Sequence, residues 1–368
     1  MLNYLNTVFD YHIFRPGVIQ FAQYDKIGLI PYNSSMLNLT QNIPCKTDVA
    51  YICREFTDID KQAESLAGYD QRYHQLSCGK FRGWSRKLIF GDAFGFHLEV
   101  LNQVLDQSAS VPNDRYLIIF LMNRNGFCKI HGHSFLPGDL LIAKPGSTVC
   151  GISGPGTHSA VISINKELFE SVLSNGYTLD SEEMIWPESG LLETDARTAE
   201  ALRTIVFEAE TAWQNHSPTF ERFQVRDNIF ESLSGLIAGR VEKTLNMDLE
   251  TRFIGRSQKY KIVQNACDYI QDHSEKNISI VDLCRETGVS RRTLEYSFRD
   301  CIGESPVSYL RKIKLNSIRR ALLDLENAGR SIGDIAAEWG IWHLSRFAQY
   351  YRNQFHELPS ETRKKVLA

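Results

Sequence analysis

The chain has 368 residues, of which 43% are hydrophobic and 23% are charged, and its formal net charge is −3. The length predicts two or three domains, and the composition is that of a folded protein rather than a disordered one. Because no run of 18 apolar residues occurs and the amino-terminal stretch mixes polar with apolar residues, we expect a cytoplasmic protein without a membrane span or a secretory signal.

Charge is distributed unevenly along the chain. Residues 256–368 contain 19 Lys and Arg against 14 Asp and Glu, whereas the rest of the chain contains 22 against 30. A basic carboxyl-terminal block joined to an acidic body is typical of a DNA-binding module attached to a domain that does not bind DNA.

The front of the chain has the pattern of β-structure. Short alternating runs at 84–90, 94–101, 116–122 and 160–164 are separated by Gly, Asn, Pro and Asp, and they predict an antiparallel barrel or sandwich within 51–190. The stretch FLPGDLLIAKPG at 135–146 resembles the strand-turn-strand signature of cupin-like sensor domains. This resemblance implies a cupin-like β-barrel that holds a small-molecule effector. We assign no structure to the extension 1–50.

Motifs for metal binding and catalysis are weak in this chain. His131 and His133 resemble the histidine pair of metal-binding cupins, but no Glu follows within the expected few residues, so we predict a turn with two polar histidines and no metal. The eight cysteines show no Cys-x-x-Cys spacing, and we expect reduced thiols. No Walker loop, Ser/His/Asp order or His-Glu-x-x-His motif occurs. We therefore expect no enzyme and no cofactor, with a cupin-type metal enzyme as an alternative.

A helical pattern begins at 191 and extends to 245. Apolar residues at helical spacing predict two amphipathic helices, which the sequence NHSP separates at 215–218. Their apolar faces either pack on the β domain or pair with a second copy of the chain in a homodimer. Residues 246–257 are predicted to form a linker.

An eleven-residue sequence occurs twice in the last third of the chain. SIVDLCRETGV at 279–289 is repeated as SIGDIAAEWGI at 331–341. In each copy a serine caps a short helix, and Gly288 or Gly340 ends it in the left-handed conformation that glycine tolerates. A short helix, a tight turn and a second helix make a helix-turn-helix, so we predict two such units, at 278–302 and 331–355.

The second helix of each unit is amphipathic. The residues expected to face inward are Leu294, Phe298 and Ile302 in the first unit, and Leu344, Phe347, Tyr351 and Phe355 in the second. Between the units, Pro306 opens a connecting helix that continues to about 325; its length of roughly 30 Å is close to the ~34 Å pitch of B-DNA. Some of its basic residues are expected to contact phosphates: Arg311, Lys312, Lys314, Arg319 and Arg320.

Residues 259–365 resemble the DNA-binding domain of the AraC/XylS family of transcriptional regulators. The features at the family's spacing are the repeated block, Ser345 with Phe347, Tyr351 with Arg352, and Pro359 with Ser360. Three residues depart from the family pattern, because Ile341, His356 and Thr362 replace an aromatic residue, a glycine and a tyrosine. Segments 69–83, 290–295 and 339–344 further resemble the ethanolamine-utilisation regulator branch of the family.

The resemblance implies that the residues opening each second helix read DNA bases. Their chemistry is suitable, because Arg pairs bidentately with guanine, Gln pairs with adenine, and Glu accepts from cytosine. Arg299, Lys312 and Arg352 are expected to contact phosphate rather than bases. The predicted DNA-binding residues are Ser290, Arg291, Arg292, Glu295, Tyr296, Arg299 and Lys312, followed by His343, Ser345, Arg346, Gln349 and Arg352 in the second unit.

We therefore expect an α+β multidomain protein. It has an amino-terminal cupin-like β-barrel sensor, a helical linker region, and a carboxyl-terminal all-α domain at 258–366 with a double helix-turn-helix. The resemblance implies an activator that binds promoter DNA, a small-molecule effector and RNA polymerase, and that forms a homodimer. The remaining alternative, besides the metal enzyme, is a DNA-binding protein that needs no ligand.

Overall fold

The computed structural model describes residues 49–66, 68–123, 127–176, 191–193, 196–214, 223–245, 258–273 and 278–367. All of these residues fall within a single unit, 39–368. The predicted extension 1–50, apart from its last two residues, and the predicted linker 246–257 lie outside the described residues. Among the helices that are described, none is long and apolar enough to cross a membrane.

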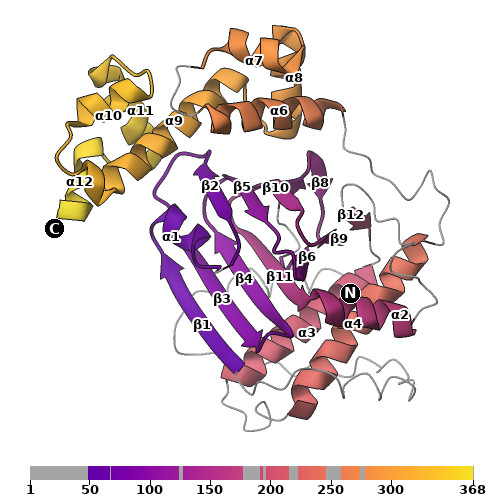
Figure 1. Cartoon of the computed structure of the whole chain (residues 1–368). Helices are drawn as coiled ribbons and strands as arrows, with labels where there is room; N and C mark the ends of the chain where they lie inside the picture. The colour runs from indigo at the N-terminus through magenta and orange to yellow at the C-terminus, as the bar shows by residue number, and fades with distance from the viewer. Residues whose placement is uncertain are drawn as a thin grey trace, which may run out of the picture. The chain divides into compact units, whose positions relative to one another are not determined.

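The strands form two antiparallel sheets (Figure 1). The larger sheet has the order β1 (Val49–Phe56), β3 (Gly83–Phe90), β4 (Phe94–Leu101), β11 (Thr157–Asn165), β6 (Arg115–Leu121), β9 (Asp139–Ala143), β12 (Leu191–Glu193). The smaller sheet has the order β2 (Gln71–Gln75), β5 (Leu105–Ser110), β10 (Thr148–Ser153), β7 (Cys128–Ile130), β8 (His133–Phe135). Helix α1 (Ile59–Ala63) links β1 to β2. The four strands predicted from alternation are confirmed as β3, β4, β6 and part of β11.

The two sheets pack against each other. Leu121 and Leu141 of the larger sheet share a buried cluster with Ile130 and Phe135 of the smaller sheet. Closing a barrel requires the edge strands to pair, but the described part of each sheet has two open edges: β1 and β12 in one, β2 and β8 in the other. The front of the chain is therefore β-rich, as predicted, but its strands form two open sheets rather than one closed barrel.

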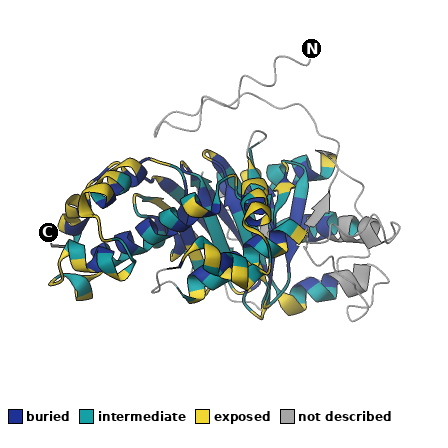
Figure 2. Ribbon diagram, turned by 90° about the horizontal axis from the view of Figure 1, so that it is seen from above, coloured by how far each residue is buried: buried dark blue, intermediate teal, exposed yellow. Residues whose placement is uncertain are grey.

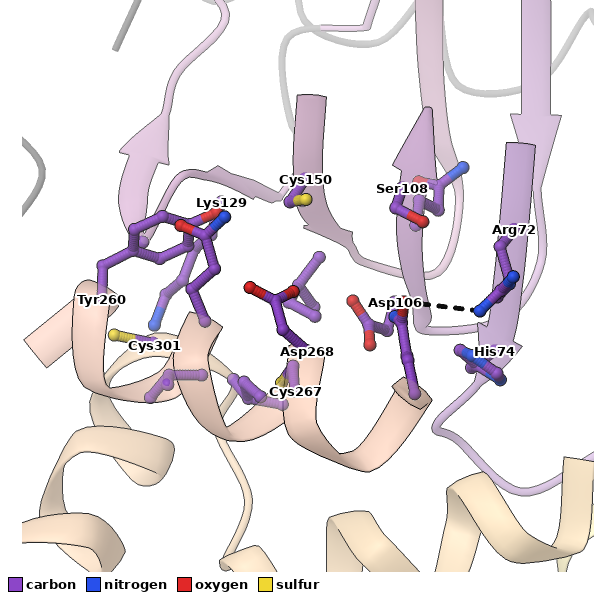
Figure 3. Close-up of a pocket in the computed structure, with 18 residues that line it drawn as sticks. Arg72, His74, Asp106, Ser108, Lys129, Cys150, Tyr260, Cys267, Asp268 and Cys301 are labelled. Carbon is purple, nitrogen blue, oxygen red and sulfur yellow. Dashed lines mark hydrogen bonds between the residues drawn. The ribbon is translucent and has the colours of Figure 1, made fainter. Parts of the chain in front are cut away.

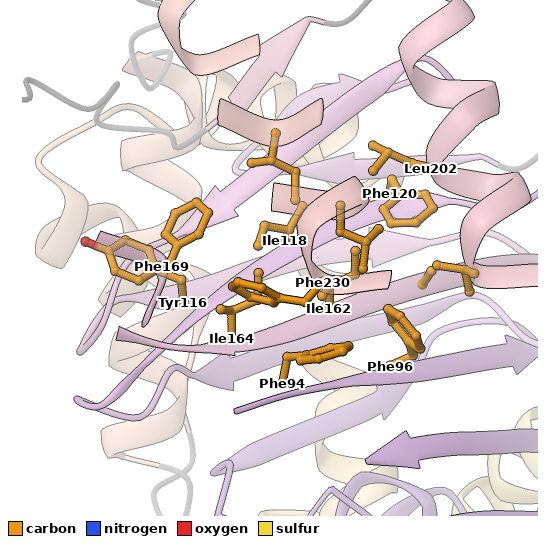
Figure 4. Packing of buried hydrophobic residues seen from close by; sticks show 14 of the residues in the cluster. Phe94, Phe96, Tyr116, Ile118, Phe120, Ile162, Ile164, Phe169, Leu202 and Phe230 are labelled. Carbon is orange, nitrogen blue, oxygen red and sulfur yellow. The ribbon is translucent and has the colours of Figure 1, made fainter. Parts of the chain in front are cut away.

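Three helices cover the other face of the larger sheet: α2 (Lys166–Gly176), α3 (Ala196–Gln214) and α4 (Phe223–Leu245). Figure 4 shows Phe94, Phe230 and Leu202 in this core, with the Phe94 and Phe230 ring centroids 5.4 Å apart. Each fully buried large apolar side chain contributes about 1.5–3 kcal/mol. Helices α3 and α4 are the two predicted amphipathic helices, and the described part of their apolar faces packs on the β domain.

The carboxyl-terminal part is entirely helical in the residues that are described. It contains α6 (Gln258–Asp272), α7 (Ile280–Thr287), α8 (Arg291–Cys301), α9 (Pro306–Leu323), the 3-10 helix η4 (Leu325–Asn327), α10 (Ile332–Glu338), α11 (Leu344–Phe355) and α12 (Pro359–Leu367). Phe298 lies in one buried apolar cluster and Phe347 in another, so each helix-turn-helix has its own core. Figure 2 shows that buried and exposed residues alternate around these helices.

The predicted helix caps and turns are confirmed. Ser279 and Ser331 accept hydrogen bonds from the backbone amides three residues later, and Gly288 and Gly340 have positive φ angles of 67° and 72°. The expected inward residues of α8 and α11 are buried or partly buried, except Leu344, which is 50% exposed. That expectation is wrong because Leu344 is the first residue of α11, outside the turns that pack on the core.

A buried polar network ties α9 to α12. Arg319 forms an ion pair with Glu357, and the Thr362 hydroxyl donates to Glu357 at 2.6 Å. Tyr351 completes the network, with its hydroxyl 2.8 Å from that of Thr362. Thr362, one of the departures from the family pattern, thus has a structural role. His356, another departure, ends α11 in the left-handed conformation with φ 52°.

Glu357→Gln should lower the free energy of unfolding by about 3 kcal/mol, because it leaves Arg319 buried opposite a neutral side chain. Burial opposes ionisation of Glu357, but hydrogen bonds from Lys365 and Thr362 and the charge of Arg319 lower its pKa to about 2. The stabilisation is therefore complete above pH 4.5, the ordinary pKa, and is lost as the pH falls toward 2. Urea unfolding between pH 2 and 7 measures this effect, and identical pH profiles for the two proteins would contradict it.

Candidate nucleic-acid interface

Helix α8 begins with a cap and an intrahelical ion pair. The Ser290 side chain accepts a hydrogen bond from the Thr293 amide, which fixes the start of the helix. Arg291 Nε lies 3.1 Å from Glu295 Oε1, and both Arg291 and Arg292 are exposed. The reading face predicted for the first unit is therefore on the surface, opposite the buried Leu294.

Tyr296 and Arg299 continue this exposed face. The Tyr296 side chain is 66% exposed, and Lys259 Nζ of α6 lies 4.8 Å from its ring centroid. Lys259 also forms a 2.9 Å ion pair with Asp300. Lys259 carries no signal in the sequence, because only the fold brings α6 beside the end of α8.

Helix α11 presents the second set of predicted residues. His343 is its N-cap and makes no side-chain capping hydrogen bond, and residues 342–346 are all exposed. The predicted residues Ser345, Arg346, Gln349 and Arg352 are exposed, whereas Phe347 and Tyr351 are buried. Trp342, which is not among the predicted residues, is 73% exposed beside this face. Its sequence position could have indicated this exposure, because Trp342 does not fall at the helical spacing of the buried residues Phe347 and Tyr351.

The basic residues of the connecting helix α9 are largely used inside the protein. Arg319 pairs with Glu357, and Arg320 Nε lies 2.7 Å from Asp60 Oδ1 of α1. Of the five basic residues from which some phosphate contacts were expected, these two are therefore held by carboxylates within the chain. Lys312 forms an ion pair with Glu304, and its side chain is only 18% exposed.

The open edge of β2 is covered by polar side chains of the DNA-binding part. The Asn316 amide of α9 accepts from Gln75 N and donates to Gln75 O, both at 3.0 Å, as a neighbouring strand would. Gln354 of α11 donates to Gln75 O at 2.9 Å, and its carbonyl accepts from the Gly79 amide at 2.9 Å. Buried backbone groups need such partners, so this edge is bound to the connecting helix α9 and to the second helix-turn-helix unit at once.

A cavity of about 60 Å³ lies between the smaller sheet and α6 (Figure 3). Charged residues of both signs line it, among them Arg72, Asp106, Lys129 and Asp268. The Tyr309 hydroxyl of α9 donates to Asp106 Oδ2 at 2.6 Å. Burial raises the pKa of Asp106 to about 6, although the hydrogen bond from Tyr309 lowers it. The cavity is thus lined by the β domain and the first reading unit together.

His131 and His133 lie in the hairpin that joins β7 to β8. His131 has φ 50° and Gly132 has φ 79°, the pair of positive angles typical of a tight two-residue hairpin. The predicted turn is therefore confirmed. Among the described residues, no group of three or more His, Cys, Asp or Glu is placed to hold a metal ion.

Asp106→Asn should raise the free energy of unfolding at pH 8 by about 1–2 kcal/mol, because it removes a carboxylate that is costly to ionise but leaves an acceptor for Tyr309. The cost in the wild type begins as the pH rises through 3.8 and is complete above 6. Urea unfolding from pH 4 to 8 should therefore show a flatter profile for the variant. Tyr309→Phe is the control that removes only the hydroxyl, and an Asp106→Asn protein less stable than wild type at pH 8 would refute the assignment.

Comparisons with known proteins agree with this geometry. Residues 283–365 match the family model described as a helix-turn-helix domain. A XylDLEGF operon transcriptional activator of Pseudomonas putida is 29% identical over 244 residues, covering 64% of this chain and 71% of that protein. The XylDLEGF operon transcriptional activator 2 of the same organism is 30% identical over 134 residues, covering 36% and 84%.

Among solved structures, the AraC-like transcriptional activator CuxR covers 78% of this chain and 100% of its own, with 16% identity and a TM-score of 0.38, too low to establish a shared fold. The matched helix-turn-helix segment contains α8 and α11, which carry the exposed predicted residues. From the two helix-turn-helix units, the family model that matches them and the XylDLEGF activators to which it is similar, the chain belongs to the AraC/XylS family of DNA-binding transcriptional regulators.

Proposed function

We propose that the chain activates transcription at promoters that it reads through α8 and α11, under the control of a small-molecule effector held by a cupin-like β domain. The observation that carries this proposal is that Leu294 and Phe298 of α8 and Phe347 and Tyr351 of α11 are buried, whereas the predicted DNA-binding residues of both helices are exposed, with Glu295 partly so. The relatives named as transcriptional activators support activation as the outcome.

The unbroken helix α9 supports binding to two half-sites on one side of the duplex. Its 18 residues extend about 27 Å at 1.5 Å per residue, which is comparable with the ~34 Å pitch of B-DNA. Direct-repeat half-sites in successive major grooves suit this spacing. In this proposal Arg292 and Arg346 read bases, and Arg299 and Arg352 contact phosphates.

The other parts of the chain have supporting roles in this proposal. Residues 51–190 form the sensor domain, 246–257 the linker and 258–366 the DNA-binding domain. The helices within 191–245 contribute the homodimer contact, and Phe207 of α3, which is 56% exposed, supports a second use of this helical pair. When the chain is bound at the promoter, the protein surface that does not contact DNA helps to recruit RNA polymerase. The resemblance to the ethanolamine-utilisation branch stays a prediction.

An effector has most influence where it contacts both domains. A ligand shifts a balance between two arrangements only through its different affinities for them. The cavity in Figure 3 meets this requirement, because residues of the β domain and of α6 line it together. We therefore favour it as the place where an effector changes the position of the first reading unit.

Arg346→Ala should weaken binding to the preferred duplex by about 1–3 kcal/mol and relax the preference at one base pair. Arg352→Ala should weaken binding to all sequences alike and reduce the slope of log K against log salt by about 1. Arg320→Ala is the matched control, because Arg320 is paired with Asp60 and should leave that slope unchanged. Fluorescence anisotropy over a salt series, with selected and scrambled duplexes, measures all three. An unaltered sequence preference in Arg346→Ala would exclude a reading role.

Removal of metal ions should leave DNA binding unchanged, because His131 lies in the hairpin turn, His133 begins β8, and no third metal-binding side chain joins them among the described residues. The measurement is the affinity of the full chain for its selected duplex before and after EDTA, together with elemental analysis of the purified protein. Stoichiometric iron or manganese that disappears in His131→Ala would favour the cupin-type enzyme instead.

A further inference from the structure

We propose that Trp342 and Leu344 recognise the C5-methyl groups of thymine in the half-site bound by α11. This inference rests on the proposed function and adds a base identity to it. The two residues form an apolar patch at the amino end of α11, directly beside the predicted reading residues Ser345 and Arg346. We call this pair the apolar patch.

The exposure of the patch is the first observation. Trp342 is 73% exposed and Leu344 is 50% exposed, although both are large apolar side chains. Single exposed apolar residues are ordinary on a protein surface. Two of them, one just before α11 and one at its first residue, adjoin a predicted interface and indicate a surface that becomes covered on binding.

The position of the patch is held by the fold. Ile341 packs against the core of the second unit, which directs the chain at Trp342 away from that core. The side chain of Leu344 lies against Gly333 of α10, where an added Cβ would come within 3.3 Å of Leu344 Cδ1. Leu344 is therefore supported on one side and open on the other, so little side-chain freedom is lost when it meets a base.

The chemistry of the major groove identifies the occupant. Of the base edges exposed there, the thymine methyl is the apolar group, and aliphatic or aromatic side chains contact it. The polar edges of neighbouring bases are left to Ser345 and Arg346. Residues 342–346 are all exposed, so the patch adjoins Ser345 and Arg346. When these two residues enter a major groove, the patch enters the same groove.

The test replaces single thymines by deoxyuridine, which pairs with adenine in the same way but lacks the methyl group. The operator is first selected from random duplexes with the full-length chain, and affinities are then measured by fluorescence anisotropy at one salt concentration. Wild type should lose about fourfold in affinity at one or two thymines of the α11 half-site, the equivalent of ~0.8 kcal/mol for one buried carbon group.

Trp342→Ala and Leu344→Ala should bind the natural operator more weakly and no longer distinguish deoxyuridine from thymine at those positions. Leu325→Ala is the matched control, because Leu325 is an apolar residue that is 69% exposed in η4, outside the predicted reading helices, and this variant should behave as wild type. The wild-type measurement does not depend on whether any variant folds.

Three results would overturn the inference: wild type that is indifferent to deoxyuridine at every position, an unchanged deoxyuridine penalty in both alanine variants, or variants with normal DNA affinity that fail to activate transcription. The last result would assign the patch to a protein partner. If wild type selects no operator at all, the proposed function fails together with the inference, whereas selection of an operator without a methyl effect leaves the proposed function standing.

Discussion

Helix α9 is the element on which the two reading units and the β domain converge. Its Asn316 side chain is almost fully buried and serves as the edge partner of β2, with hydrogen bonds to both backbone groups of Gln75. If α9 moved away from β2 and no water replaced it, these polar groups would lose their hydrogen-bond partners, and each unpaired group would cost about 1–3 kcal/mol of stability. The β domain and the DNA-binding part are therefore joined by contacts that form or break as a set.

This arrangement divides the basic residues into two groups with different roles. Arg319 and Arg320 neutralise Glu357 and Asp60 and so hold α9 in place. The arginines of α8 and α11 remain on the surface, where Arg291 forms an ion pair with Glu295. Exposed ion pairs of this kind contribute little to stability, so Arg291 exchanges its partner for DNA at small cost. The connecting helix positions the two units, and the second helices supply the contacts.

The junction also links the chemistry of the β domain to the reading units. Tyr309 of α9 and Asp106 of β5 share a hydrogen bond at the margin of the cavity, and the pKa of Asp106 is raised by burial there. A ligand or charge that enters the cavity beside Asp106 therefore alters the free energy of the contact between α9 and the β domain. In the proposed function, this is the route by which an effector reaches the DNA-binding surface.

Local signals in the sequence were sufficient for much of the carboxyl-terminal part. The serine caps, Gly288 and Gly340, and the spacing of Leu294 and Phe298 act within one or two helical turns, so they determined the two helix-turn-helix units and the exposed faces of α8 and α11. The alternation of β3 and β4 likewise marked the β-rich front. What only the tertiary structure decided were the pairings between distant segments: two open sheets in place of a barrel, the capture of Arg319 and Arg320 by carboxylates, and the outward position of Leu344. Those outcomes depend on which surfaces meet in space, and a pattern along the chain carries no information about partners tens or hundreds of residues away.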